Sequence, residues 1–134
     1  MRLLGIDYGR VRVGLALGDS DSRVASPMEV LAEKNPEDAM RRIQEIVKQE
    51  GIDRLVVGVP KPLKDRTRET DQAKEIRGFM ASLREKGFDV VEEDETWSSA
   101  IAARQVEEMG RRGKRDDLAA MAILQTYLDR MGRG

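Results

Sequence analysis

Residues 3–19 read LLGIDYGRVRVGLALGD, two short apolar runs separated by a glycine-bearing stretch. The first run covers residues 3–7 and ends in the carboxylate of Asp7, and the second covers residues 13–17. Apolar runs of this length on either side of turn residues predict a β-hairpin. Residues 28–31 predict a third, weaker strand. The chain is therefore expected to open with an antiparallel meander.

Helices and strands are expected to alternate after this meander. A helix is predicted over residues 36–50, because Asn35 suits its N-cap and Gly51 suits the left-handed residue after its end. The apolar runs at residues 55–59 and 88–91 predict two more strands, with an amphipathic helix between them.

Two further helices are expected near the carboxyl end, one capped by Ser98 and one beginning near Asp116. A meander followed by strand-helix alternation predicts an α/β fold with a five-stranded mixed sheet and helices on both faces. The length of 134 residues suits a single domain, which we expect to cover residues 1–134.

The composition excludes several kinds of chemistry. The chain has no cysteine and no histidine, so disulfides, thiolate zinc sites, cysteine nucleophiles and histidine bases are ruled out. No apolar run is long enough for a membrane span or a secretory signal, so we expect a cytoplasmic protein with no membrane partner. The 24 basic and 25 acidic side chains nearly cancel, so binding to a polyanion would need local basic patches.

Asp7 is the first candidate for chemistry, because an open α/β sheet places its ligands at the carboxyl ends of its strands. A lone aspartate after a strand is more often a turn former. The surrounding pattern, however, is specific: it reads Gly5-x-Asp7-x-Gly9-x-x-Arg12-x-Gly14-x-Ala16-x-x-Asp19. It closely resembles the YqgF family, also called RuvX-like Holliday junction resolvases and associated with processing of the 5′ end of pre-16S rRNA.

Two other segments carry the same resemblance. Asp94-Glu95 is similar to the family's Asp-Glu-Arg-Leu-Ser/Thr-Thr motif, and residues 116–125 are similar to its carboxy-terminal helix. The chain departs from the family at Thr96-Trp97, where Arg-Leu is usual, and at Arg66, where the family normally has a glycine.

The resemblance implies an RNase H-like fold in which Asp7, Glu95 and Asp116 are the catalytic residues and hold Mg²⁺ or Mn²⁺. Three carboxylates that meet repel one another, and a pair of hard divalent ions resolves the conflict while activating water for hydrolysis. Asp94 remains an alternative to Glu95 as a metal ligand. Asp116 could instead serve only as a helix cap that complements the helix dipole.

The implied activity is a metal-dependent endonuclease of the two-metal-ion type, with precursor rRNA as the preferred substrate. The alternatives are a resolvase acting on branched DNA and a non-catalytic RNA-binding factor in ribosome assembly. The sequence leaves the oligomeric state open between monomer and homodimer.

Basic residues cluster beside the proposed acids and are expected to contact phosphates, although solvated loops are often charged as well. The expected nucleic-acid-binding residues are Arg12, Lys61, Lys64, Arg66, Arg111, Arg112, Lys114 and Arg115. Tyr8 and Trp97 could stack on bases, but a solitary aromatic residue more often packs in the core.

Overall fold

The computed structural model describes residues 1–32, 35–61, 65, 67–95 and 116–132, with only the backbone for residues 116 and 117. Its elements follow the predicted alternation, and they are β1 (Arg2–Tyr8), β2 (Val13–Asp19), β3 (Val24–Leu31), α1 (Pro36–Glu50), β4 (Arg54–Val59), α2 (Asp71–Glu85), β5 (Val90–Asp94) and α4 (Asp116–Met131). The helix expected at Ser98 lies outside the described residues.

The strands form one five-stranded sheet in the order β3-β2-β1-β4-β5. The antiparallel pairs β1–β2 and β2–β3 form the opening meander, and β4 and β5 are added in parallel to β1. The predicted mixed sheet is therefore confirmed. Since β1, β4 and β5 run in the same direction, their carboxyl ends meet at a single edge.

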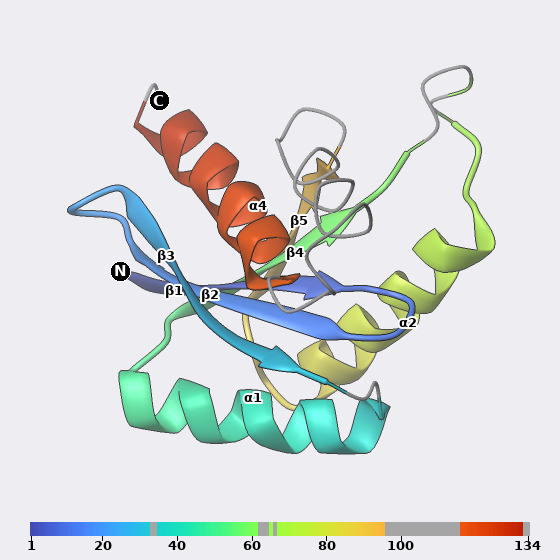
Figure 1. Cartoon of the computed structure of the whole chain (residues 1–134), viewed down its shortest axis with the longest axis horizontal. Coiled ribbons are helices and arrows are strands. Elements are labelled where there is room, and N and C mark those ends of the chain that lie inside the picture. Colours follow the sequence, from blue (N-terminus) through green and yellow to red (C-terminus); the bar gives the residue numbers. More distant parts are fainter. Residues whose placement is uncertain (33–34, 62–64, 66, 96–115, 133–134) are drawn as a thin grey trace.

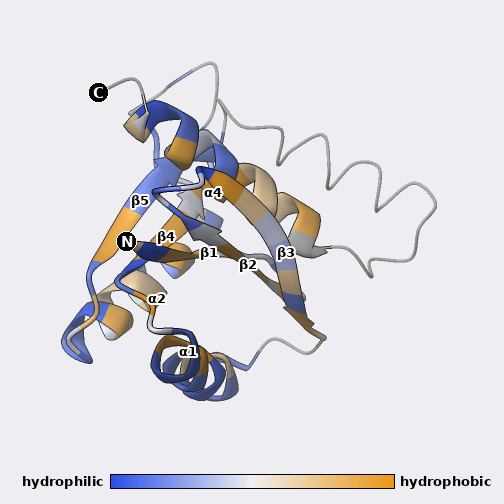
Figure 2. Ribbon diagram, turned by 90° about the vertical axis from the view of Figure 1, so that its left-hand side faces the viewer, coloured by the Kyte–Doolittle hydropathy of each residue, from blue (hydrophilic) through white to orange (hydrophobic). Residues whose placement is uncertain are grey.

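Helices cover both faces of the sheet, as expected. In Figure 1, α4 lies above the sheet, and α1 and α2 lie below it. Each face has its own core. Residues of β1 alternate between the two cores, with Leu4, Ile6 and Tyr8 facing α1 and α2, and Leu3 facing α4. Figure 2 shows α1 end-on, with hydrophilic residues over its outer side.

The predicted limits of α1 are confirmed in atomic detail. The side-chain oxygen of Asn35 accepts hydrogen bonds from the backbone N–H groups of Glu37 and Asp38, at 3.0 and 3.2 Å. Gly51 follows the helix with φ 64°, in the left-handed region. These caps satisfy backbone groups that the helix itself leaves unpaired.

Two strands differ from the prediction in their limits. β3 begins at Val24 rather than at residue 28, because its ladder with β2 extends past Pro27 after a register shift between Leu15 and Ala16. An edge strand tolerates proline beside such an irregularity. β5 covers Val90–Asp94 rather than residues 88–91, since it pairs with β4 along that whole length.

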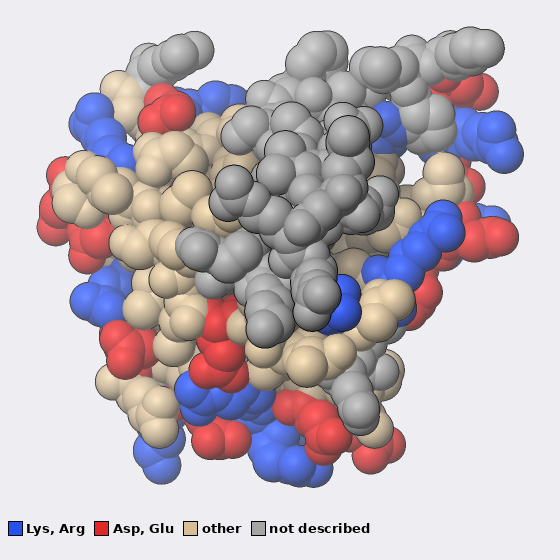
Figure 3. Space-filling model, viewed as in Figure 1, with Lys and Arg blue, Asp and Glu red and all other residues tan. Residues whose placement is uncertain are grey.

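No helix in the described part of the chain is long and apolar enough to cross a membrane. On the face shown in Figure 3, acidic and basic side chains are interspersed around the rim of the molecule. This mixture agrees with the near-zero net charge of the sequence.

Candidate active site

Asp7 lies at the carboxyl end of β1 and is buried, with 3% of its surface exposed. Side chains alternate along a strand, so Leu3, Gly5 and Asp7 share one face of the sheet. Leu3 belongs to the core under α4, and a methyl group added at Gly5 would lie 2.8 Å from Cβ of Leu124 in α4. Asp7 is therefore on the α4 face.

Glu95 follows β5 directly and is fully buried. It lies over Gly58 of β4, because a methyl group added at Gly58 would be 2.9 Å from both Cγ and Oε1 of Glu95. The same methyl group would be 2.4 Å from Cδ1 of Ile123 in α4, so Glu95 is on the α4 face. Gly58 follows Val57, the partner of Ile6 in the β1–β4 ladder, so Gly58 is level with Asp7.

The two carboxylates therefore share a face and an edge of the sheet. Asp94 lies differently. It pairs with Val59 inside the ladder, and Glu92, two residues earlier on the same side of β5, contacts Arg77 of α2. This geometry favours Glu95 over Asp94 as the acid that faces Asp7.

The course of α4 along β1 brings its first residue toward the same edge. A methyl group added at Gly5 would lie 3.0 Å from the carbonyl oxygen of Ala120, and one added at Gly18 would lie 3.0 Å from Leu128. Gly18 pairs with Leu3, so α4 runs antiparallel to β1. Asp116 is one turn before Ala120, on the side of Asp7. The side chain of Asp116 lies outside the part of the chain that the structure describes, so its convergence with Asp7 and Glu95 remains a prediction.

Among the side chains that the structure describes, no three acids are grouped closely enough to hold a metal ion. Asp7 and Glu95 nevertheless offer oxygen ligands of the kind that Mg²⁺ and Mn²⁺ accept, fixed on two different strands of one sheet. These two carboxylates fit a divalent cation whose coordination is completed by a further ligand.

The sequence reasoning missed Glu93, a third buried acid on the α4 face, with 1% of its surface exposed. Its Oε2 pairs with Arg130 of α4, and its Oε1 has no hydrogen-bond partner among the described residues. Burial raises the pKa of Glu93, although the charge of Arg130 opposes this shift. Strand alternation was the available signal for Glu93, because every second residue of a strand lies on the same face and residues 91, 93 and 95 therefore share one.

Tyr8 proves to be a core residue and not a stacking platform for bases. Only 2% of its surface is exposed, and its ring stacks on Phe79 of α2 with 4.2 Å between centroids. Burial raises the pKa of the Tyr8 hydroxyl, and Glu75 adds to the shift. The stack anchors the end of β1 immediately after Asp7. Trp97 lies outside the described residues.

Few of the predicted phosphate contacts can be placed. Arg12 is half-buried in the β1–β2 turn, where its carbonyl oxygen accepts from the N–H of Gly9 at 3.0 Å. Lys61 is half-buried beyond β4, with its Nζ 3.8 Å from Glu92. The remaining residues, Lys64, Arg66, Arg111, Arg112, Lys114 and Arg115, lie outside the described part of the chain.

Solved structures with a similar fold include two resolvases. Thermus thermophilus RuvC in complex with a Holliday junction substrate superposes with a TM-score of 0.58 at 17% identity, over 98% of this chain and 97% of that one. The Fowlpox virus resolvase in complex with Holliday junction DNA gives 0.57 at 12% identity, over 98% and 99% of the two chains. These likenesses confirm the RNase H-like fold.

Bacterial relatives align over nearly the whole chain. A protein of Desulforudis audaxviator is 38% identical, covering 96% of this chain and 94% of the relative. A protein of Thermus thermophilus is 33% identical, covering 97% and 98%. Both carry the name "Putative pre-16S rRNA nuclease". A family model described as "RuvX: Holliday junction resolvase" matches residues 1–130. The chain therefore belongs to the RuvX family.

Proposed function

We propose that this chain is a metal-dependent endonuclease that hydrolyses phosphodiester bonds through Asp7, Glu95 and Asp116. The observation that carries the proposal is the burial of Asp7 and Glu95 on one face and at one edge of the sheet. Carboxylate oxygens are the ligands that hard divalent cations prefer in proteins, and this edge offers them from two acids on one face.

The chain's contribution is to hold the ligands in place. β1 and β4 are hydrogen-bonded neighbours, and β4 in turn pairs with β5. Asp7 is the last residue but one of β1, and Glu95 directly follows β5, so both acids are held at the ends of connected strands. α4 closes the face behind them with Ile123 and Leu124, both fully buried. When a pair of Mg²⁺ or Mn²⁺ ions is bound, it supplies the activation of water and the stabilisation of the leaving oxygen.

The preferred substrate is the 5′ end of pre-16S rRNA, which places the protein in ribosome biogenesis. The supporting observation is the name shared by relatives that align over nearly the whole chain. A branched DNA junction is the second candidate, favoured by the family description and by the junction-bound resolvases of similar fold. Either substrate implies a cytoplasmic location.

The test compares wild type with Asp7→Asn and Glu95→Gln on a precursor rRNA fragment, a four-way DNA junction and a plain duplex. Each reaction is run with Mg²⁺, with Mn²⁺ and with EDTA. Asp21→Asn is the matched control, because Asp21 is an exposed acid in the β2–β3 turn at the opposite end of the sheet. We expect metal-dependent cutting by wild type and control that both site variants lose.

The outcomes separate the candidate functions. Cutting of the precursor RNA but not the junction favours rRNA processing, and the reverse favours junction resolution. Tight RNA binding without cutting by wild type favours an assembly factor. Undiminished cutting by Asp7→Asn would overturn the proposed mechanism.

A further inference from the structure

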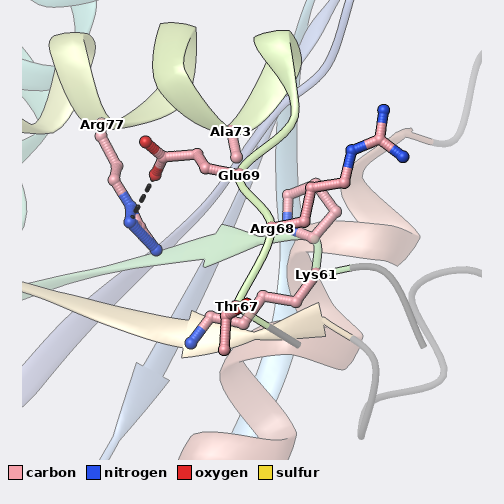
Figure 4. A pocket seen from close by; sticks show the side chains of 7 residues that line it. Lys61, Thr67, Arg68, Glu69, Ala73 and Arg77 are labelled. Carbon is pink, nitrogen blue, oxygen red and sulfur yellow. Dashed lines mark hydrogen bonds and ion pairs between the residues drawn. The ribbon is translucent and has the colours of Figure 1, made fainter. Parts of the chain in front are cut away.

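A pocket of about 220 Å³ opens between the end of β4 and the first turns of α2. Three cations from separate parts of the chain line it: Lys61 just past β4, Arg68 before α2, and Arg77 within α2 (Figure 4). We propose that this pocket binds one backbone phosphate of the nucleic-acid substrate, next to the bond that is cut but not at it. The inference rests on the proposed function, since it takes the ligand to be a nucleic acid.

The pocket lies at the same edge of the sheet as the acids but on the other face. Lys61 is two residues beyond Val59, which pairs with Asp94, the residue before Glu95. Glu92 of β5 contacts both Lys61 and Arg77 on the α2 side. Glu95 lies over Gly58 on the α4 side. A nucleic-acid strand that crosses this edge can therefore present one phosphate to the acids and another to the pocket.

The charges in the pocket leave room for an anion. Arg77 pairs with Glu69 at 2.7 Å and with Glu92 at 3.1 Å. Its Nε is buried and lacks a hydrogen-bond partner among the described residues. Lys61 and Arg77 therefore contact these carboxylates, whereas no described ion pair joins Arg68 to either of them. A phosphate that enters the pocket could pair with the exposed guanidinium of Arg68.

Arg68 is the cation of this pocket that solvent reaches most freely. It is exposed, and its side chain makes no ion pair or hydrogen bond with the residues that the structure describes. Its backbone is nevertheless held in a turn: the carboxylate of Asp65 accepts from the N–H of Thr67 at 3.0 Å and from its hydroxyl at 2.6 Å, and the carbonyl oxygen of Asp65 accepts from the N–H of Arg68 at 3.2 Å. Figure 4 shows the guanidinium of Arg68 directed away from Arg77.

The first turn of α2 adds to the attraction. Thr70 caps the helix by accepting from the N–H of Ala73 at 3.1 Å. The N-terminus of a helix carries a partial positive charge, which favours a phosphate nearby.

Replacing Arg68 with glutamine removes one positive charge from the pocket without breaking a described side-chain contact. We expect the affinity for RNA or DNA to fall about twofold to fivefold at low salt, and the slope of log affinity against log salt to lose about 0.7 to 0.9. Lys86→Gln is the matched control, because Lys86 is an exposed cation at the other end of the same helix. The control is expected to change neither quantity.

The decisive experiment replaces single phosphates of the substrate with neutral methylphosphonates, one position at a time. Binding is measured in EDTA and in an Asp7→Asn background, so that no strand is cut even if Asp7 is not catalytic. We expect one position at which the neutral group weakens binding more when Arg68 is present than when glutamine replaces it. If the losses of affinity at every position are the same with and without the Arg68→Gln substitution, the proposed phosphate site is wrong. A pocket that holds only a free anion would give this same result.

The two proposals fail in different ways. If Asp7→Asn still cuts but a single phosphate remains coupled to Arg68, the proposed active site is wrong and the pocket stands. If cutting depends on Asp7 but Arg68→Gln binds every methylphosphonate substrate as Lys86→Gln does, the pocket alone is wrong. A protein that binds neither RNA nor DNA contradicts both.

Discussion

Adding one methyl group at Gly58 is expected to displace Glu95 and to test its role in the reaction. The new carbon would lie 2.9 Å from Cγ and Oε1 of Glu95 and would also clash with Cδ1 of Ile123. Carbon atoms pack at about 3.5 Å or more, so the side chains must yield by about half an ångström or more. Overpacking of this kind costs about 1–3 kcal/mol of stability, and misplacing a reacting group by about 1 Å can slow a reaction about a hundredfold.

The assay for Gly58→Ala combines urea denaturation with single-turnover cleavage at saturating Mn²⁺. Gly78→Ala is the matched control, because a methyl group added at this exposed helical position meets nothing within 4 Å. That control is expected to gain about 0.8–1.0 kcal/mol and to cleave at the wild-type rate. Loss of cleavage in Gly58→Ala alone then reports on Glu95 and not on a general effect of alanine.

A double variant separates the two clashes at Gly58. Ile123→Val removes Cδ1, so in Gly58→Ala/Ile123→Val the two closest contacts that remain for the added methyl group are Cγ and Oε1 of Glu95. We expect this protein to recover part of the lost stability while its cleavage stays slow. Wild-type cleavage by both the single and the double variant would refute the reasoning, since Glu95 would then have moved without consequence.

Three further predictions concern the scaffold. Asn35→Ala removes the α1 cap and should lower the free energy of unfolding by about 0.5–2 kcal/mol in urea, with cleavage unchanged. Phe79→Leu removes the ring that stacks on Tyr8, so stability should fall by about 0.5–1.5 kcal/mol beyond the loss of buried area, and an unchanged melting temperature would contradict this. Glu93 has a raised pKa in the folded state, so its contribution to the stability of wild type should fall as the pH rises through the ordinary value of 4.5 and onward through the raised one. Glu93→Gln cannot ionise, so its melting temperature relative to wild type should increase from pH 4 to pH 8 in EDTA, and a decrease would be inconsistent with a buried acid that Arg130 compensates only in part.

The sheet could be predicted because its signals are local. Two apolar runs and the glycine-bearing stretch between them predict the hairpin of residues 3–17, and the cap residues Asn35 and Gly51 predict both ends of α1. The start of β3 could not be found in the same way. Its pairing with β2 across Pro27 depends on a register shift in the partner strand, which no local pattern in residues 24–27 reveals.

The candidate site was predictable in part. Asp7 follows from its place at a strand end, and Glu95 was chosen over Asp94 only by resemblance. What the sequence could not supply was the close approach of Glu95 and α4 over Gly58, since that depends on which residue of α4 lies across the sheet. Strand alternation puts Glu93 on the face of Glu95, but it does not show that Glu93 is buried. In a run of four acids, burial depends on the position of α4, and Arg130 is 37 residues away along the chain.

If the buried acids hold a cation, metal binding should raise the free energy of unfolding. A ligand at one hundred times its dissociation constant adds about 2.7 kcal/mol, which for a domain of this size raises the melting temperature by about 10 °C. We expect Mn²⁺ to produce such a shift in wild type and in Asp21→Asn but not in Asp7→Asn. In EDTA no such shift is expected in any of the three proteins. A metal-dependent shift that survives in Asp7→Asn would place the cation elsewhere, even if the variant had lost cleavage.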